Sequence, residues 1–148
     1  MSCIRYCIAV YGATTGQQTQ RVQKCINFCA RVLTGKRKFD RISSTLRSLG
    51  WLSADQLRDF HTVTVLRRVL VTSQPEELAA LFVRNSELHS RDTRCSYMLC
   101  PPRIRSEMGR RRFAYRAASL YNALPAEARE AASRKAFRTS VKRSLLGT

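Results

Sequence analysis

The chain has 148 residues, 27 of them Lys or Arg and only 10 Asp or Glu, which gives a formal net charge of +17 at pH 7. Hydrophobic residues make up 44% of the sequence, enough to fill a core, so the composition argues against wholesale disorder. A chain of this length forms one domain or part of a larger protein, and its charge favours a polyanionic partner, nucleic acid first and an acidic membrane second.

The sequence gives no sign of membrane insertion or secretion. No apolar run approaches the roughly 18 residues that a membrane-spanning helix needs. The first residues, MSCIRY, lack the charged segment and long apolar core of a secretory signal. We therefore expect the six cysteines to be free thiols and the protein to be soluble and intracellular, in the nucleus or cytoplasm, without a membrane partner.

Apolar periodicity predicts a first long helix over residues 16–33, with Gly35 as its C-terminal cap. The side chains that share one arc, and that we expect to be buried, are Val22, Cys25, Ile26, Cys29, Val32 and Leu33. Phe28 falls instead on the basic side of this helix. It either packs against another helix or forms an aromatic platform of the kind that single-strand binders use.

A second long helix is predicted over about 54–72, after a basic loop and a short helix at 44–49. Ser53 and Gln56 form a capping box behind the hydrophobic Trp51 and Leu52. Apolar side chains surround almost the whole helix, which predicts deep burial, although residues 62–65 would also suit a strand. These side chains are Leu57, Phe60, Val63, Leu66, Val69 and Leu70.

The remainder of the chain is predicted to be helical at both ends and irregular between them. Pro75 opens a helix that runs to about Val83, and residues 84–112 are polar with a break at the double proline 101–102. A helix then begins near residue 113 and stops at Pro125. Its apolar face comprises Phe113, Ala117, Leu120, Tyr121 and Leu124.

Ser133 is expected to cap a last helix, after a short helical turn that follows Pro125. This last helix has a narrow apolar stripe (Phe137, Val141, Leu145) and a basic remainder (Arg134, Lys135, Arg138, Lys142, Arg143). The whole pattern predicts a mostly α fold: five or six short helices in a small irregular bundle, with a less regular segment around 84–112.

Three consecutive arginines, Arg110, Arg111 and Arg112, stand at the start of the helix predicted from residue 113. Cations are unfavourable there, because the amino end of a helix already carries partial positive charge. We therefore expect an anion, most simply a phosphate, at this point. The structural alternative is a cluster of solvated arginines.

The cysteines give only a weak indication of a metal site. Cys95 and Cys100 are spaced almost as in a zinc knuckle, and His89 is close by, but no second pair lies at a matching distance. Cys25 and Cys29 are interpreted as small core residues. We expect neither a metal nor another cofactor.

No residues assemble a reaction centre. Asp55 and Asp59 lie one helical turn apart and could hold a metal, but the helix start accounts for Asp55, and Arg58 lies between them. His61 lies on a crowded apolar helix and is expected to be a packed core histidine. Phosphate-cradling glycine motifs and a nucleophile elbow are both absent from the sequence.

Seven segments of the sequence stand out in order: VYG (10–12), VQKCINFCARVLTG (22–35), KFDRIS (38–43), LGWL (49–52), HSRDTR (89–94), GRRRFAY (109–115) and LYNALP (120–125). In the same order, they resemble the C-terminal region of a non-LTR (LINE-type) retrotransposon reverse transcriptase. The resemblance covers nearly the whole chain. It implies a thumb-like helical region at 1–83 and a basic post-thumb region at 84–148. The family is an RNA-directed DNA polymerase, but its metal-binding F/Y-x-D-D motif is absent here, so we expect no catalytic residue and no enzyme.

A thumb grips the template–product duplex by its backbone, so the resemblance implies RNA or DNA as a partner, together with the missing polymerase domains. Charge and predicted helix face, and not the family, select the candidate contacts. Two alternatives remain: a basic helical protein-interaction module that binds no nucleic acid, and a metal-dependent enzyme. The candidate nucleic-acid-binding residues are Arg21, Lys24, Lys36, Arg37, Lys38, Arg103, Arg105, Arg110, Arg111 and Arg112.

Overall fold

The structure is a computed structural model that describes residues 2–11, 14–88 and 95–147. Within these ranges it contains eleven helices and no strand, apart from one antiparallel bridge between Arg84 and Leu99. The predicted mostly α fold is confirmed. Helices outnumber the expected five or six because seven of them are single turns or little more, and only α3, α5, α9 and α11 are long.

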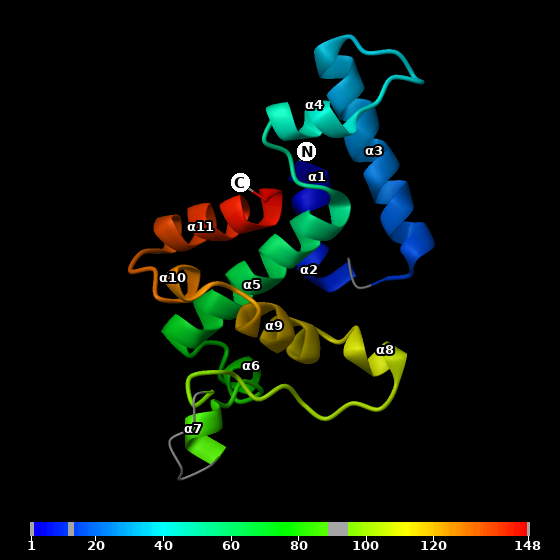
Figure 1. Cartoon of the computed structure of the whole chain (residues 1–148). Helices are drawn as coiled ribbons and strands as arrows, with labels where there is room; N and C mark the ends of the chain where they lie inside the picture. The colour runs from blue at the N-terminus through cyan, green and yellow to red at the C-terminus, as the bar shows by residue number, and fades with distance from the viewer. Residues whose placement is uncertain (1, 12–13, 89–94, 148) are drawn as a thin grey trace.

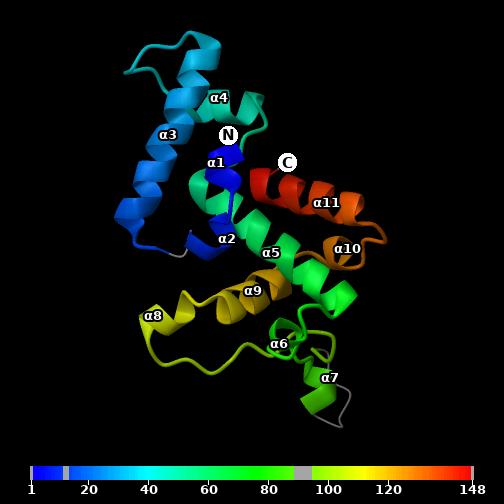
Figure 2. The ribbon, with the colours of Figure 1, turned by 180° about the vertical axis from the view of Figure 1, so that it is seen from behind.

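The helices follow one another as α1 (Ser2–Arg5), α2 (Ile8–Tyr11), α3 (Gly16–Thr34), α4 (Ser43–Ser48), α5 (Ala54–Thr72), α6 (Glu76–Ala79), α7 (Asn85–Leu88), α8 (Glu107–Arg110), α9 (Phe113–Asn122), α10 (Ala126–Arg129) and α11 (Arg134–Leu146). Helix α5 runs through the middle of the molecule, and α2, α3, α9 and α11 pack against it (Figures 1 and 2). None of the described helices combines the length and the apolar character that a bilayer crossing needs.

Helix α5 begins at the predicted capping box. The Ser53 hydroxyl accepts a hydrogen bond from the Gln56 backbone N–H at 3.3 Å, and the Gln56 side chain accepts one from the Ser53 N–H at 2.9 Å. The segment that would also suit a strand is helical, and the hydroxyls of Thr62 and Thr64 donate to backbone carbonyls one turn earlier. The capping box and the tertiary contacts of α5 therefore outweigh the strand preference of this segment.

The main hydrophobic cluster joins α5 to α9 and α11. Leu66 of α5 and Phe137 and Val141 of α11 are fully buried, and Tyr121 of α9 is almost so. Each such side chain stabilises the fold by about 1.5–3 kcal/mol relative to an exposed position. Residues on both sides of the expected boundary at 83/84 contribute to this cluster, so the parts of the chain before and after this boundary share one core.

Helix α3 has the predicted extent, and Gly35 ends it in the left-handed conformation with φ +64°. The predicted burial of its apolar arc is wrong for most residues. Only Ile26 is buried, together with Ala30, while Val32 and Leu33 are 66% exposed. Cys29 is half-buried, and the predicted core residue Cys25 is exposed. The reason is that α3 meets the rest of the fold along one narrow contact with α4 and α5.

The helix predicted from Pro75 to Val83 is shorter than expected. Helix α6 ends at Ala79, and the chain continues in turns that direct Phe82 into the main cluster. The backbone N–H of Cys100 then donates to the carbonyl of Val83 at 2.8 Å, which ties the start of the irregular segment to its middle. An early end to α6 therefore allows both contacts.

Candidate nucleic-acid interface

Five of the ten candidate cations lie on α3 and the loop that follows it. Arg21 and Lys24 are exposed on the helix, and Lys36, Arg37 and Lys38 are exposed in the loop. The loop also presents Phe39, which is 91% exposed with the Lys38 ammonium 5.8 Å from its ring centroid.

Phe28 of α3 is 67% exposed and packs against no neighbouring helix closely enough to be covered. Exposed aromatic rings among cations are suited to stacking with unpaired bases. No described helix therefore covers Phe28, and its role as a platform for bases stays a prediction.

The other five candidates surround α8. Arg103 and Arg105 are exposed in the approach to this helix, and Arg110 and Arg112 are exposed at its end. Arg111 is half-buried and lies 3.9 Å from the carboxylate of Glu107. The three arginines that precede α9 thus differ: one meets an acidic side chain of the protein, and the other two face solvent.

Gly109 allows the α8 turn to form at this place. Its position is buried, and a Cβ atom there would come within 2.2 Å of the Ile104 side chain. The Ser106 hydroxyl caps the turn by accepting from the Gly109 N–H at 3.1 Å. Close contact between Gly109 and Ile104 therefore holds the arginine run at the outer surface, ahead of α9.

Asp55 and Asp59, the carboxylates considered for metal binding, are occupied by arginines. The Arg58 guanidinium lies 2.7 Å from the Asp55 carboxylate and 3.3 Å from that of Asp59. Arg116 of α9 also pairs with Asp59. Guanidinium groups therefore neutralise both carboxylates and link α5 to α9.

Cys95 is exposed and Cys100 is half-buried, and both are free thiols. His89 and the rest of the segment 89–94 lie outside the described residues, as does residue 12 of the VYG segment. Among the residues that the structure does describe, no three His, Cys, Asp or Glu side chains gather at one place as a metal site would require.

His61 is half-buried, and its ring meets that of Phe60 edge-on, with the ring centroids 5.6 Å apart. Burial, with smaller effects of the charges on Arg5 and Arg138, lowers the pKa of His61 below its ordinary value of 6.5. The imidazole is therefore neutral at pH 7. This packing agrees with the predicted role, although the side chain is less deeply buried than a core residue.

The two elements that carry the candidates, α3 and α8, lie toward the same edge of the ribbon in both views (Figures 1 and 2). The loop that follows α3 is at its far end, and α8 lies toward the end where α3 begins. The candidates therefore belong to two separate groups, one on α3 and its loop and one around α8.

The sequence pattern predicts the basic face of α11, but the cations of this face are not among the ten candidate residues. The structure shows that the cations of this face line a groove with Phe60 of α5. The repeat of Arg134, Arg138 and Lys142 at every fourth residue could have indicated this surface, because residues four apart lie on one face of a helix.

No family model matches this chain, and no match was found among curated proteins or among solved structures. The function of the candidate interface is therefore inferred from its own residues, their exposure and their charge.

Proposed function

We propose that this chain is a non-catalytic nucleic-acid-binding protein that resembles the C-terminal part of a retrotransposon RNA-directed DNA polymerase. Its exposed cations would grip the phosphate backbone of RNA or DNA. One observation carries the proposal: of the ten candidate cations, only Arg111 has an ion-pair partner among the described residues, and the other nine are exposed.

Unpaired, exposed cations suit contacts with phosphate, which position a nucleic acid without reading its sequence. Ion pairs elsewhere in the described residues involve only α5, α8 and α9 and the residue that caps α8. A net charge of +17 would also accelerate association with a polyanion.

The test is equilibrium binding of labelled RNA, DNA and an RNA–DNA hybrid, measured by fluorescence anisotropy at several salt concentrations. We expect the logarithm of the affinity to fall linearly with the logarithm of the salt concentration, with a slope of about −0.7 to −0.9 for each phosphate neutralised. A flat salt titration, or no binding at moderate salt, would refute the proposal.

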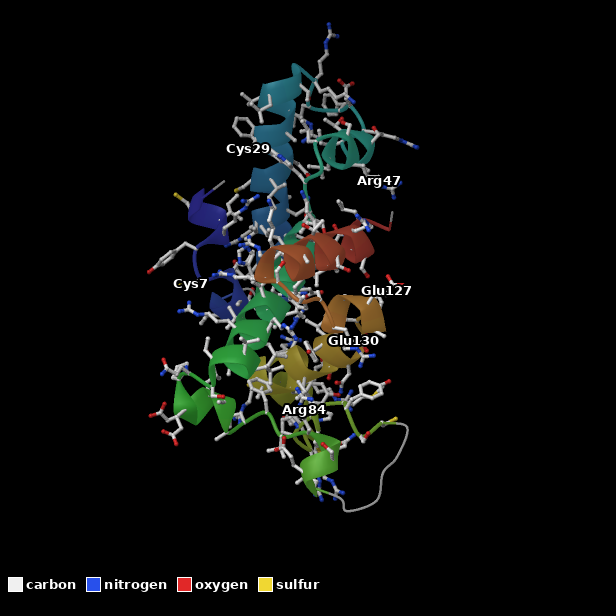
Figure 3. All side chains as sticks on the ribbon, turned by 90° about the vertical axis from the view of Figure 1, so that its left-hand side faces the viewer. Cys7, Cys29, Arg47, Arg84, Glu127 and Glu130 are labelled. Atoms are coloured by element: carbon white, nitrogen blue, oxygen red, sulfur yellow. The ribbon has the colours of Figure 1, made fainter. Side chains whose placement is uncertain are left out.

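A paired substitution locates the contact. R110Q/R112Q removes two exposed charges beside α8 and should make the slope less negative by about 1.4 to 1.8. The matched control is R47Q/R84Q, which removes the same charge from two exposed arginines on α4 and ahead of α7 (Figure 3). Equal effects of the two double substitutions would show that net charge alone, and not this surface, determines binding.

A protein-interaction module is the second candidate, and the apolar side chains that α3 exposes favour it. Phe28, Val32 and Leu33 are each about two-thirds exposed. Exposed apolar side chains that gather together are typical of protein–protein contact sites. Absence of nucleic-acid binding, with retention of the fold, would favour this candidate over the first.

A further inference from the structure

Helix α11 and the first half of α5 form an open groove of about 790 Å³. Among the described residues, Phe60 is its only aromatic lining residue, and no Asp or Glu lines it. The cations that line it are Arg134, Lys135, Arg138, Lys142 and Arg143.

Nothing in the described part of the chain neutralises these five charges. The ion pairs of that part all lie elsewhere, on α5, α8, α9 and the cap of α8. Glu127 is on α10, the preceding helix, and Glu130 is the residue that caps it, and neither lines the groove (Figure 3). Like charges one turn apart destabilise a helix, so a bound anion would relieve this repulsion.

The groove is held in shape without a ligand. Phe137 and Val141, on the opposite face of α11, are fully buried in the core. The Gln56 side chain donates a hydrogen bond to the Leu145 carbonyl at 2.6 Å and ties the end of α11 to the start of α5. The Arg138 guanidinium lies 5.4 Å from the Phe60 ring centroid, a cation–π distance that orders the side chain before binding.

We propose that this groove is a second backbone site, which holds consecutive phosphates of one nucleic-acid strand; the inference rests on the proposed function. Arg134, Arg138 and Lys142 span eight residues of helix, or about 12 Å at 1.5 Å per residue. One strand of a duplex presents a phosphate about every 3.4 Å along its axis, so this row matches about three or four phosphates.

The site contacts the backbone and not the bases. Phe60 is only 7% exposed and lies beneath Arg138, so no base can stack on it. This distinguishes the groove from the α3 side, where Phe28 and Phe39 are exposed. Binding in the groove is therefore independent of sequence and accepts paired as well as unpaired strands.

The test uses the full chain with the substitutions R138Q/K142Q, and R47Q/R84Q as the charge-matched control. Probes of about 20 nucleotides or base pairs, as single-stranded RNA, duplex DNA and RNA–DNA hybrid, are titrated between about 50 and 200 mM salt. We expect R138Q/K142Q to weaken binding of all three probes by at least about tenfold near 100 mM salt. For the duplex DNA probe, the slope of log affinity against log salt concentration should become less negative by about 1.8. The control should bind all three probes more tightly than R138Q/K142Q does.

Binding by R138Q/K142Q equal to that of the control would overturn the groove site alone, whereas no binding by the unsubstituted chain would overturn the proposed function as well. A thermal melt of each variant shows whether it is folded. If R138Q/K142Q fails to fold, K135Q/R143Q removes the same charge from two exposed positions of the groove and answers the same question. R138K/K142R, which keeps both charges, should retain binding.

Discussion

Arg67 of α5 holds the last two helices against the core, and its substitution gives a direct test of this packing. Its guanidinium donates to the carbonyls of Arg129 and Ala131, each at 2.9 Å. Arg129 is the last residue of α10, where a helix leaves backbone acceptors unsatisfied, and Ala131 follows the residue that caps this helix. The same guanidinium lies 5.6 Å from the ring centroid of Phe137, the largest fully buried side chain of α11.

Replacing Arg67 by Met keeps an apolar stem and removes both hydrogen bonds. A hydrogen bond to a charged group contributes about 1.5–3 kcal/mol, so two contribute about 3–6 kcal/mol. Because Arg67 is only half-buried, water can form part of the hydrogen bonding that the substitution removes. We therefore expect R67M to lower the free energy of unfolding by about 2–4 kcal/mol. For a chain of this size that corresponds to a fall in Tm of about 5–15 °C.

Circular dichroism during heating and urea titration measures the effect. R68M is the matched control, since the neighbouring Arg68 has an exposed side chain and should tolerate the change within about 0.5 kcal/mol. The stability of R67K should lie between those of R67M and R68M. A lysine ammonium keeps the charge, but it lacks the planar guanidinium that donates to two carbonyls at once. Equal stability of R67M and R68M would refute the role assigned to Arg67.

Three further substitutions test other parts of the fold. S53A removes the cap of α5 and should lower the free energy of unfolding by about 1 kcal/mol, seen as a lower urea midpoint at unchanged slope; an unchanged midpoint would count against the capping box. D59N leaves Arg58 and Arg116 without a shared carboxylate and should destabilise by about 1–3 kcal/mol, clearly more than D55N at the more exposed neighbouring acid. The lowered pKa of His61 means that the unfolded chain binds a proton more readily than the folded one, so stability is retained above pH 6.5 and lost as pH falls below it toward the folded-state pKa. H61Q should reduce this loss in urea titrations at a series of pH values, and the same acid sensitivity in H61Q would exclude His61 as its source.

Predictions from the sequence succeeded where a local signal and the tertiary contacts agree. Ser53 and Gln56 determine the start of α5 by hydrogen bonds within four residues, and Ser133 does the same for α11, where its hydroxyl accepts from the Ala136 N–H at 3.0 Å. Gly35 ends α3 because its backbone adopts a positive φ that other residues rarely adopt. Such signals act over short distances, so they can be read without knowledge of the fold.

Burial on α3 could not be predicted in the same way. Periodicity shows that Cys25, Val32 and Leu33 share one side of the helix, but it does not show whether another element covers that side. In the structure, α4 and α5 cover only the part around Ile26 and Ala30. The exposed remainder is a property of the tertiary arrangement.

The groove of α11 escaped prediction for a related reason. Its cations come from one helix and were recognised as a basic face, but its inner wall is Phe60 of α5, from the other half of the chain. The contact between these two helices turns a charged helix surface into a concave one. Sequence spacing predicts the order of the charges along α11. The shape of the groove depends on how α11 packs on α5.

The position of Asp59 between two helices has a physical reason. Asp59, the half-buried acid, lies between α5 and α9 and neutralises arginines that pack there, because a buried unpaired guanidinium would be strongly destabilising. Arg21 and Lys24 of α3 and the five cations that line the groove of α11 need no such partner for folding, since they are exposed to water. They do repel one another, and a net charge of +17 on a chain of this size destabilises its compact form. A polyanion laid along α3 or α11 would reverse the sign of that contribution. Under the proposed function, the same cations that weaken the free fold would therefore provide free energy for binding a phosphate backbone.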